Sequence, residues 1–284
     1  SGNSSQVHRR RNRNQCPEIS RAGLAEGDCQ TSLADGTAGD PAVFTPDKRS
    51  NFEMLPKQGA IAVFVKTPGY SPLKTRLAQS VGTVQAEQFH ILSARAVAAV
   101  VHSVANQKSI TPFWAVAEPE AQQDSLWNQF KTMGQGAGGL GNRLAYVQQQ
   151  LFEFSQFVIF LGADTPHLPI TLLNEAVEIL SVESATPQFV IGPACDGGFY
   201  LFGSQTALDP AIWLNVPYSV EDTTRALREQ IQDLGEIHLL PELSDVDTVQ
   251  ELPLVARQLT EGDDWLTEQL QVLKWIQEWE ARSD

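Results

Sequence analysis

The chain has little positive charge, few cysteines and no long apolar run. Its 284 residues include 20 Lys and Arg against 34 Asp and Glu, which gives a formal net charge of −14. An acidic balance of this size argues against nucleic acid or an anionic membrane surface as the main partner. Because no apolar stretch reaches the length of a signal-peptide core or a membrane-spanning helix, the sequence predicts no membrane span.

Cysteine usage bears on the location of the protein. The three residues Cys16, Cys29 and Cys195 supply neither the even number of a disulfide framework nor the spacing of a zinc site. A chain with this pattern is typical of a reducing compartment, so the sequence favours a cytoplasmic protein.

Residues 1–56 differ in composition from the rest of the chain. They contain few apolar residues, show no periodicity and carry a basic stretch at residues 9–13. A segment of this kind cannot bury enough apolar surface to offset the entropy that folding costs. We therefore expect a disordered N-terminal leader.

From residue 57 onward, segments typical of strands and helices alternate. The predicted strands are 60–65, 112–117, 157–164, 188–193, 199–202 and 237–240, and the predicted helices are 84–106, 121–130, 140–154, 170–182, 220–234 and 248–259. This alternation indicates an α/β fold whose mainly parallel sheet is flanked by helices. We expect residues 57–260 to form one domain. The amphipathic stretch 261–284 is expected to pack as a helix on that domain or on a second subunit of a homo-oligomer.

A group of cations follows the first predicted strand. The residues of this loop that suit a phosphate are Lys66, Gly69, Lys74 and Arg76. Ser71 and Pro72 resemble a helix N-cap and the first helical residue, whose free N–H groups attract anions. Open α/β sheets bind ligands at their carboxyl edge, so the loop predicts a phosphate site. The alternative is an ordinary solvated surface loop.

Aspartates follow two later segments of the chain. Asp164 comes after a continuous apolar run, and Pro166 prevents the strand from continuing past it. Asp245 and Asp247 lie two residues apart, so in an extended segment their carboxylates share a face. A hard divalent cation prefers such oxygens and needs few protein ligands when phosphates complete its shell. The alternative is that these residues only form turns or cap the helix that begins near Thr248.

Six segments, in chain order, resemble the bacterial glycosyltransferases of the GT-A fold: VKTPGYSPLKTRLA, QGAGGLGNRL, GADTPHL, GPACDGGFYLFG, VPYSVEDTTRAL and SDVDTVQEL. Within that group the chain is most similar to the small nucleotide-diphospho-sugar transferase-like proteins that are also tied to arsenosugar biosynthesis. The resemblance runs from about residue 60 to residue 252. It implies a Rossmann-like, mainly parallel mixed sheet and a nucleotide-sugar-binding site.

The resemblance also implies roles for individual residues. Those matched to nucleotide-binding positions are Lys66, Gly69, Lys74, Arg76, Gly141, Arg143, Gly197 and Gly198. Asp164 and Asp247 match metal-binding carboxylates, which implies bound Mg²⁺ or Mn²⁺. An inverting reaction needs a base for the acceptor hydroxyl; Asp196 is the first candidate and Glu221 the second. The alternative for Asp196 is a purely structural role in an Asp-Gly turn.

The implied activity is metal-dependent transfer of a sugar from a nucleoside diphosphate to a small-molecule acceptor. Two alternatives stay open. The loop KTPGYSPLKTRLA also resembles that of the 2-phospholactate guanylyltransferases, which are nucleotidyltransferases that release pyrophosphate. A non-catalytic nucleotide-binding protein is the other alternative. Tyr218 stands where the relatives often have Trp, and Val249 where they often have Pro, so the acceptor is not implied.

Overall fold

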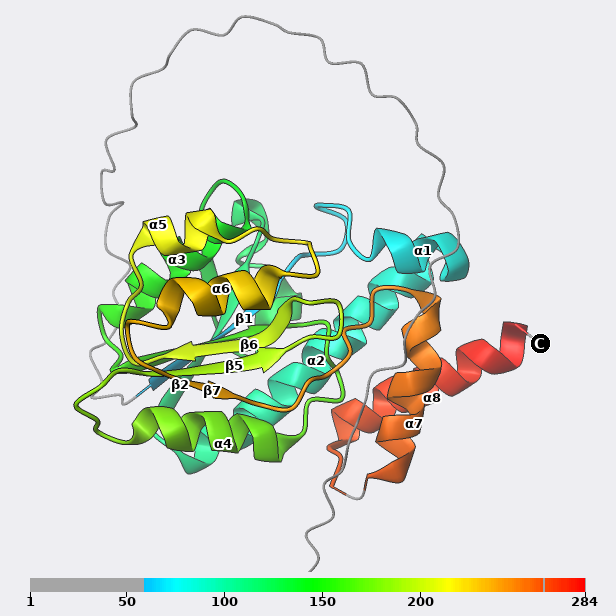
Figure 1. Ribbon diagram of the computed structural model, residues 1–284. Coiled ribbons are helices and arrows are strands. Elements are labelled where there is room, and N and C mark those ends of the chain that lie inside the picture. The colour runs from blue at the N-terminus through cyan, green and yellow to red at the C-terminus, as the bar shows by residue number, and fades with distance from the viewer. Residues whose placement is uncertain (1–58, 263, 284) are drawn as a thin grey trace, which may run out of the picture. The chain divides into compact units, whose positions relative to one another are not determined.

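The computed structural model describes residues 59–262 and 264–283, and the leader predicted for residues 1–56 lies outside these ranges. The described residues form one seven-stranded sheet in the order β3-β2-β1-β4-β6-β5-β7, with helices on both of its faces (Figure 1). The strands are β1 (Gly59–Val65), β2 (Ile110–Val116), β3 (Lys131–Gly134), β4 (Phe157–Gly162), β5 (Gln188–Pro193), β6 (Phe199–Ser204) and β7 (Glu236–Leu239).

Strand β6 is the exception in an otherwise parallel sheet. It runs antiparallel to its neighbours β4 and β5, whereas β1 is parallel to both β2 and β4. The turn between β5 and β6 contains the Asp-Gly pair, as expected of a tight connection between two antiparallel strands. The predicted α/β class with a mainly parallel mixed sheet is confirmed.

The two faces of β1 explain how the helices pack on the sheet. Its side chains Ile61, Val63 and Val65 join one apolar cluster with α2 (Thr83–Gln107) and α4 (Ile170–Ser181). Its alanines, Ala60 and Ala62, face the opposite cluster. That second cluster is filled by residues of α3 (Leu140–Phe152), α5 (Pro210–Asn215) and α6 (Thr223–Ile231). Each large side chain fully buried in this way contributes about 1.5–3 kcal/mol, so the central strands are held firmly.

A third apolar cluster joins the last two described helices to the helices that follow β1. It contains Leu77 of α1 (Thr75–Val81) and Phe89 of α2. From the other side come residues of α7 (Leu252–Glu261) and α8 (Thr267–Ser283), which pack against each other and, through α8, against α2. The side chain of Gln269 on α8 is buried and donates hydrogen bonds to the carbonyl groups of Pro166 (2.9 Å) and Leu168 (3.0 Å).

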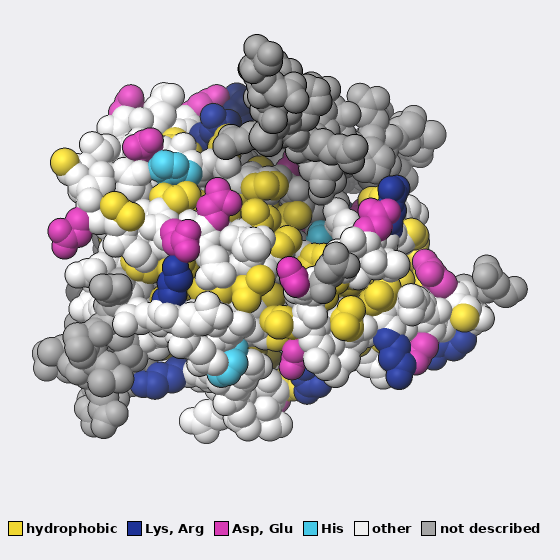
Figure 2. All heavy atoms as spheres, turned by 90° about the horizontal axis from the view of Figure 1, so that it is seen from below, with side chains coloured by type: hydrophobic (Ala, Val, Ile, Leu, Met, Phe, Trp, Pro, Cys, Tyr) yellow, Lys and Arg dark blue, Asp and Glu magenta, His cyan; other side chains and the backbone are white. Residues whose placement is uncertain are grey.

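On the face shown in Figure 2, Lys and Arg side chains lie among Asp and Glu side chains. Among the described residues on that face they do not merge into a continuous basic area. No helix in the described part of the chain is both long enough and apolar enough to span a membrane.

The helix predicted for residues 121–130 is wrong. The structure has two short 3₁₀ turns there, Pro119–Ala121 and Ser125–Trp127, followed by strand β3, which the sequence did not predict. The chain is redirected because Asp124 accepts a hydrogen bond from the backbone of Leu126 and so caps the second turn. The indole of Trp127 donates to the hydroxyl of Thr67 at 3.0 Å, which fixes the segment beside the loop after β1.

The predicted start of helix α1 is also wrong. The helix begins at Thr75, not at Pro72, and Lys74 before it has left-handed dihedral angles of φ 45° and ψ 39°. The hydroxyl of Ser71 does not cap a helix but donates to the carboxylate of Glu118. A contact distant in sequence has therefore replaced the local cap that the Ser-Pro pair favours.

His167, in the loop before α4, predicts a pH dependence of stability. Its side chain is buried, and neither ring nitrogen has a hydrogen-bond partner among the described residues. Burial lowers the pKa of His167 to about 4, from 6.5. The unfolded chain therefore takes up this proton at a higher pH than the folded chain does. The stability that the neutral ring contributes is complete above about pH 6.5 and is lost as the pH falls toward 4.

We therefore expect the free energy of unfolding of the unaltered chain to fall between pH 7 and pH 4.5 by about 2–3 kcal/mol more than that of His167→Leu. This estimate takes about 1.36 kcal/mol for each unit by which the pKa differs between the folded and the unfolded chain. Urea denaturation at a series of pH values measures this. The exposed His102→Leu is the matched control and should follow the unaltered profile. Superimposable profiles for His167→Leu and the unaltered chain would contradict the expectation.

Candidate functional site

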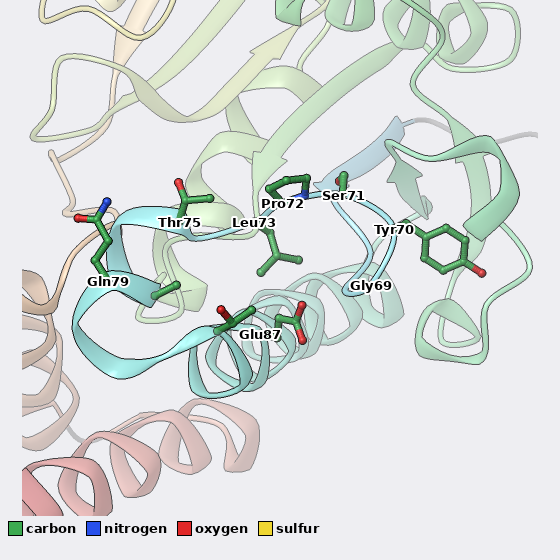
Figure 3. Close-up of a pocket in the computed structure, with 10 residues that line it drawn as sticks. Gly69, Tyr70, Ser71, Pro72, Leu73, Thr75, Gln79 and Glu87 are labelled. Carbon is green, nitrogen blue, oxygen red and sulfur yellow. The ribbon is translucent and has the colours of Figure 1, made fainter. Parts of the chain in front are cut away.

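Two hollows lie near the carboxyl ends of the central strands. The larger, ≈ 570 Å³, is bounded by the loop after β1 and by α1 and α2. Figure 3 shows Tyr70 turned away from the other labelled side chains and Glu87 rising from α2 beneath the loop. Among the described residues that line this hollow, only Glu87 carries a charge. The groups that could perform chemistry therefore lie elsewhere.

The smaller hollow, ≈ 300 Å³, gathers acidic side chains against an apolar wall. Its acidic residues are Asp164, Asp196, Asp245 and Asp247. Its apolar and aromatic residues include Phe64, Leu140, Phe160, Phe199, Tyr218 and Val220. Carboxylates that accept hydrogen bonds beside flat apolar surfaces suit a ligand with hydroxyl groups and a partly apolar body.

The side chain of Lys74 joins two of the acidic segments. Its ammonium nitrogen lies 2.8 Å from Asp164 Oδ1 and 3.2 Å from Asp247 Oδ1, and it also donates to the carbonyl oxygen of Val246. The Lys74 side chain is only 3% exposed. Arg76 approaches the other oxygen of Asp247 at 3.2 Å from the solvent side. The structure thus brings together three of the segments that the sequence singled out.

Charge explains why Lys74 and Asp164 are both ionised. Burial alone would lower the pKa of Lys74, but Asp164 and Asp247 outweigh it, so the pKa is raised. Burial would likewise raise the pKa of Asp164, but the ammonium group of Lys74 outweighs it, so the pKa is lowered. Each group therefore keeps the other charged across the physiological pH range.

Asp245 has a different environment from Asp164 and Asp247. Burial and the neighbouring Asp164 carboxylate raise the pKa of Asp245 to about 7, although it accepts a hydrogen bond from the hydroxyl of Thr165. This bond and the bond from the backbone of Val246 to the Asp164 carbonyl (3.0 Å) join the two acidic segments. Asp245 therefore helps to hold the pair of segments together.

Arg143 holds the glycine-rich segment before α3. Its guanidinium donates to the carbonyl of Gly138 and to the side chain of Gln135, each at 3.1 Å. Gln135 in turn donates to the carbonyls of Val65 and Ala115 at the ends of β1 and β2. The predicted contact of Arg143 with a nucleotide stays a prediction.

Two of the predicted glycines, Gly141 and Gly197, are required by close packing. A Cβ on Gly141 would lie 2.5 Å from the carbonyl oxygen of Trp213. Gly197 has φ +90°, and a Cβ there would lie 2.0 Å from the carbonyl oxygen of Glu221. The backbone of Gly198 donates to Asp196 Oδ1 at 2.8 Å, so Asp196 forms the turn while it also lines the smaller hollow.

The other predicted residues lie at the margin of the site. Lys66 is exposed, and its carbonyl accepts a hydrogen bond from His90. Gly69 has φ +80° in the loop above the larger hollow. The side chain of Glu221 is exposed and is not among the described residues that line the smaller hollow. The predicted nucleotide contacts of Lys66 and Gly69 and the predicted role of Glu221 as a base therefore stay predictions.

Sequence reasoning missed several residues that hold the site. His90 Nδ1 lies 4.0 Å from Asp164 Oδ1, and the hydroxyl of Ser93 donates to the carbonyl of Ala163. Burial lowers the pKa of His90 despite the attraction of Asp164, so the ring is neutral at pH 7. The signal that could have revealed both residues is their position: they are polar, three residues apart and on the apolar face of α2. Glu118 accepts from the backbone of Thr67 at 2.9 Å and fixes the loop after β1.

The acidic segments fit a divalent cation that is completed by other ligands. In the part of the chain that the structure describes, no three His, Cys, Asp or Glu side chains form a group that could hold a metal ion by themselves. Asp164, Asp247 and the carbonyl of Val246 nevertheless direct three oxygens at one cationic nitrogen. Oxygens of this kind are the ligands that Mg²⁺ and Mn²⁺ prefer, and both ions commonly take the remainder from phosphate and water.

Comparisons with known proteins agree with this architecture. Residues 100–220 match a family model described as an uncharacterized protein conserved in bacteria (DUF2064). A crystal structure from Desulfovibrio desulfuricans G20, provisionally named a nucleotide-diphospho-sugar transferase, is 24% identical; the match covers 78% of this chain and 98% of that chain with a TM-score of 0.67. The described residues share the fold of that structure. The fold that the sequence motifs implied is thereby confirmed, and the family model spans Asp164 and Asp196 but neither Lys74 nor Asp247.

Two further solved structures show weaker similarity. A cytidylyltransferase from Leptospira borgpetersenii is 11% identical, with a TM-score of 0.46 over 80% of this chain and 95% of that chain. The glucosyl-3-phosphoglycerate synthase of Mycobacterium tuberculosis is 9% identical, with a TM-score of 0.39 over 66% of this chain and 69% of that chain. No curated protein sequence matches the chain.

Proposed function

We propose that this protein is a glycosyltransferase that moves a sugar from a nucleoside diphosphate to a small-molecule acceptor with the help of Mg²⁺ or Mn²⁺. The observation that carries the proposal is the meeting of Lys74, Asp164 and Asp247 beside the smaller hollow. This edge of the sheet, where the fold class binds ligands, then offers three things together. They are carboxylates for a metal ion, the positive charge of Lys74 for phosphates and a pocket for a sugar ring.

Each polar group has a role that follows from its position. Arg76 is exposed at the rim and offers its guanidinium to the phosphates of the donor. Lys66, which follows β1, offers its ammonium group to the same phosphates. The carboxylates that line the hollow accept hydrogen bonds from sugar hydroxyl groups, while Phe199 and Tyr218 give the ring an apolar surface. These contacts orient the donor and exclude water from its reactive carbon.

Asp164 and Asp247 would hold the divalent cation, with Asp164 kept ionised by its surroundings. When bound, the ion neutralises the negative charge that develops on the departing diphosphate. Asp196 is the proposed base that removes the proton from the acceptor hydroxyl, because it lines the hollow on the side of the hairpin.

A thermal-shift panel tests this function. Nucleoside diphosphate sugars and nucleoside triphosphates are each added with and without Mn²⁺, and every stabilising compound is then incubated with candidate acceptors for product analysis. We expect stabilisation by a nucleoside diphosphate sugar that depends on Mn²⁺, because a ligand that binds only the folded state stabilises it more as its concentration rises above its Kd. We expect the reaction to release a nucleoside diphosphate.

Other outcomes identify the alternatives. Stabilisation by a nucleoside triphosphate followed by release of pyrophosphate would contradict sugar transfer and establish nucleotidyl transfer. Metal-dependent binding without any product across the acceptor panel would indicate a nucleotide-binding protein that lacks catalytic activity.

A further inference from the structure

Lys74 has a backbone conformation that is disfavoured for its residue type. Among the described residues other than glycine, only Lys74 and Ser219 have a positive φ. The left-handed conformation places a Cβ close to the following carbonyl, so it persists only where surrounding contacts impose it. Here it directs the side chain into the site while the Lys74 carbonyl still accepts the first hydrogen bond of α1, from Ala78 at 2.8 Å.

The ammonium group of Lys74 occupies the position of a cation between two carboxylates. It contacts one oxygen of Asp164, one of Asp247 and the carbonyl of Val246, and it is almost completely buried. The first two are the oxygens that the proposed function assigns to a divalent metal. A metal ion and an ammonium group cannot share these oxygens at contact distance, because two positive charges so close together repel each other.

The lysine side chain can leave this position without unfolding the site. It is a flexible chain of four carbons whose head group binds carboxylate and phosphate alike. The exposed Arg76 and Lys66 mark the adjoining rim as the place where an anionic donor would lie. A diphosphate at that rim offers the ammonium group an alternative set of negative oxygens and so frees Asp164 and Asp247.

We propose that Lys74 acts as a resident cation that occupies the metal position until a diphosphate arrives. In the absence of nucleotide it holds Asp164 and Asp247 together and competes with the metal for their oxygens. With a diphosphate present it moves to the phosphates, and the metal takes its place. Binding of the metal and of the diphosphate is therefore positively coupled, and each raises the affinity for the other by the same factor. The competition rests on the geometry alone, and the coupling rests on the proposed function.

Titration with Mn²⁺ alone tests the competition. Free Mn²⁺ is measured by electron paramagnetic resonance for the unaltered chain, Lys74→Met and the matched control Lys274→Met, which removes an exposed lysine of α8. We expect Lys74→Met to bind Mn²⁺ at least tenfold more tightly than the unaltered chain and Lys274→Met to bind it as well as the unaltered chain does. Adding Asp247→Asn to Lys74→Met should abolish the gain, which places the ion at this site. Equal or weaker binding by Lys74→Met would overturn the proposal.

A second measurement tests the coupling. UDP is added to each titration as the diphosphate. The amount of Mn²⁺ that free UDP binds is measured without protein and subtracted from the bound Mn²⁺. The unaltered chain should bind Mn²⁺ at least fivefold more tightly with UDP, whereas Lys74→Met should show no such gain. Circular dichroism confirms that Lys74→Met is folded, and Lys74→Gln replaces it if it is not. Failure of sugar transfer in the product assay leaves the Mn²⁺ competition intact, so the two proposals fail separately.

Discussion

Replacing Asp164 with asparagine is expected to reduce the rate of sugar transfer about 100- to 1,000-fold, the range seen when one group that stabilises developing charge is removed. Asparagine keeps the shape of the side chain but removes its negative charge. Asp164 lies directly after the central strand β4 and is the nearest carboxylate to Lys74, at 2.8 Å. Its pKa is lowered by Lys74 despite burial, so the charge is present at every pH at which the enzyme would act.

The measurement is the rate of nucleoside diphosphate release with the donor found in the thermal-shift panel, together with the Mn²⁺-dependent shift itself. Both should disappear in Asp164→Asn. Asp209→Asn is a matched control because Asp209 caps α5 by accepting a hydrogen bond from Ala211, and asparagine caps helices equally well. If Asp164→Asn kept the affinity and rate of the unaltered chain, the assigned site would be wrong.

Replacing Gly197 with alanine is expected to destabilise the fold by about 3 kcal/mol or more. Two effects act together at this position. Gly197 has φ +90°, which a residue with a Cβ adopts only at a cost. The new Cβ would also lie 2.0 Å from the carbonyl oxygen of Glu221, and a backbone atom cannot yield as a flexible side chain does.

Urea denaturation gives this loss as a lower midpoint with an unchanged slope. Gly162→Ala serves as the control because its Cβ would have no atom nearer than 4.0 Å, the backbone nitrogen of Asp164. A midpoint for Gly197→Ala equal to that of Gly162→Ala would show that the hairpin relaxes freely, contrary to the expectation.

Much of the fold could be predicted because local patterns and tertiary packing agree. The apolar run of β4 could be recognised because a strand buried on both faces needs apolar residues at every position. The helix predicted to begin near Thr248 has a local signal, because Thr248 and Glu251 have the spacing of a capping box, and both of its hydrogen bonds are present. The Asp-Gly pair after β5 predicted the hairpin because its backbone preference needs no help from distant residues.

The rest could not be predicted because distant contacts decide it. Ser71 and Pro72 carry a strong local signal for a helix start, but Glu118 binds the Ser71 hydroxyl and the helix begins later. Lys74 was interpreted as a loop cation for phosphate, whereas the structure buries it against Asp164. The sequence pattern around Lys74 does not reveal that its partner is Asp164, which lies far away along the chain. The sequence could still place the cations and Asp164 at the carboxyl edge of the sheet, because each follows a predicted strand.

The pairing of Lys74 with Asp247 has a consequence for how the protein is made. These two residues are separated by 173 positions, and Gln269, which steadies the loop after Asp164, lies another 22 residues beyond Asp247. Asp247 therefore emerges from the ribosome long after Lys74, and Gln269 emerges later still. Since contacts between remote positions form slowly, a nascent chain carries Asp164 without its full set of neighbours until Gln269 has emerged, and the site is completed only after that.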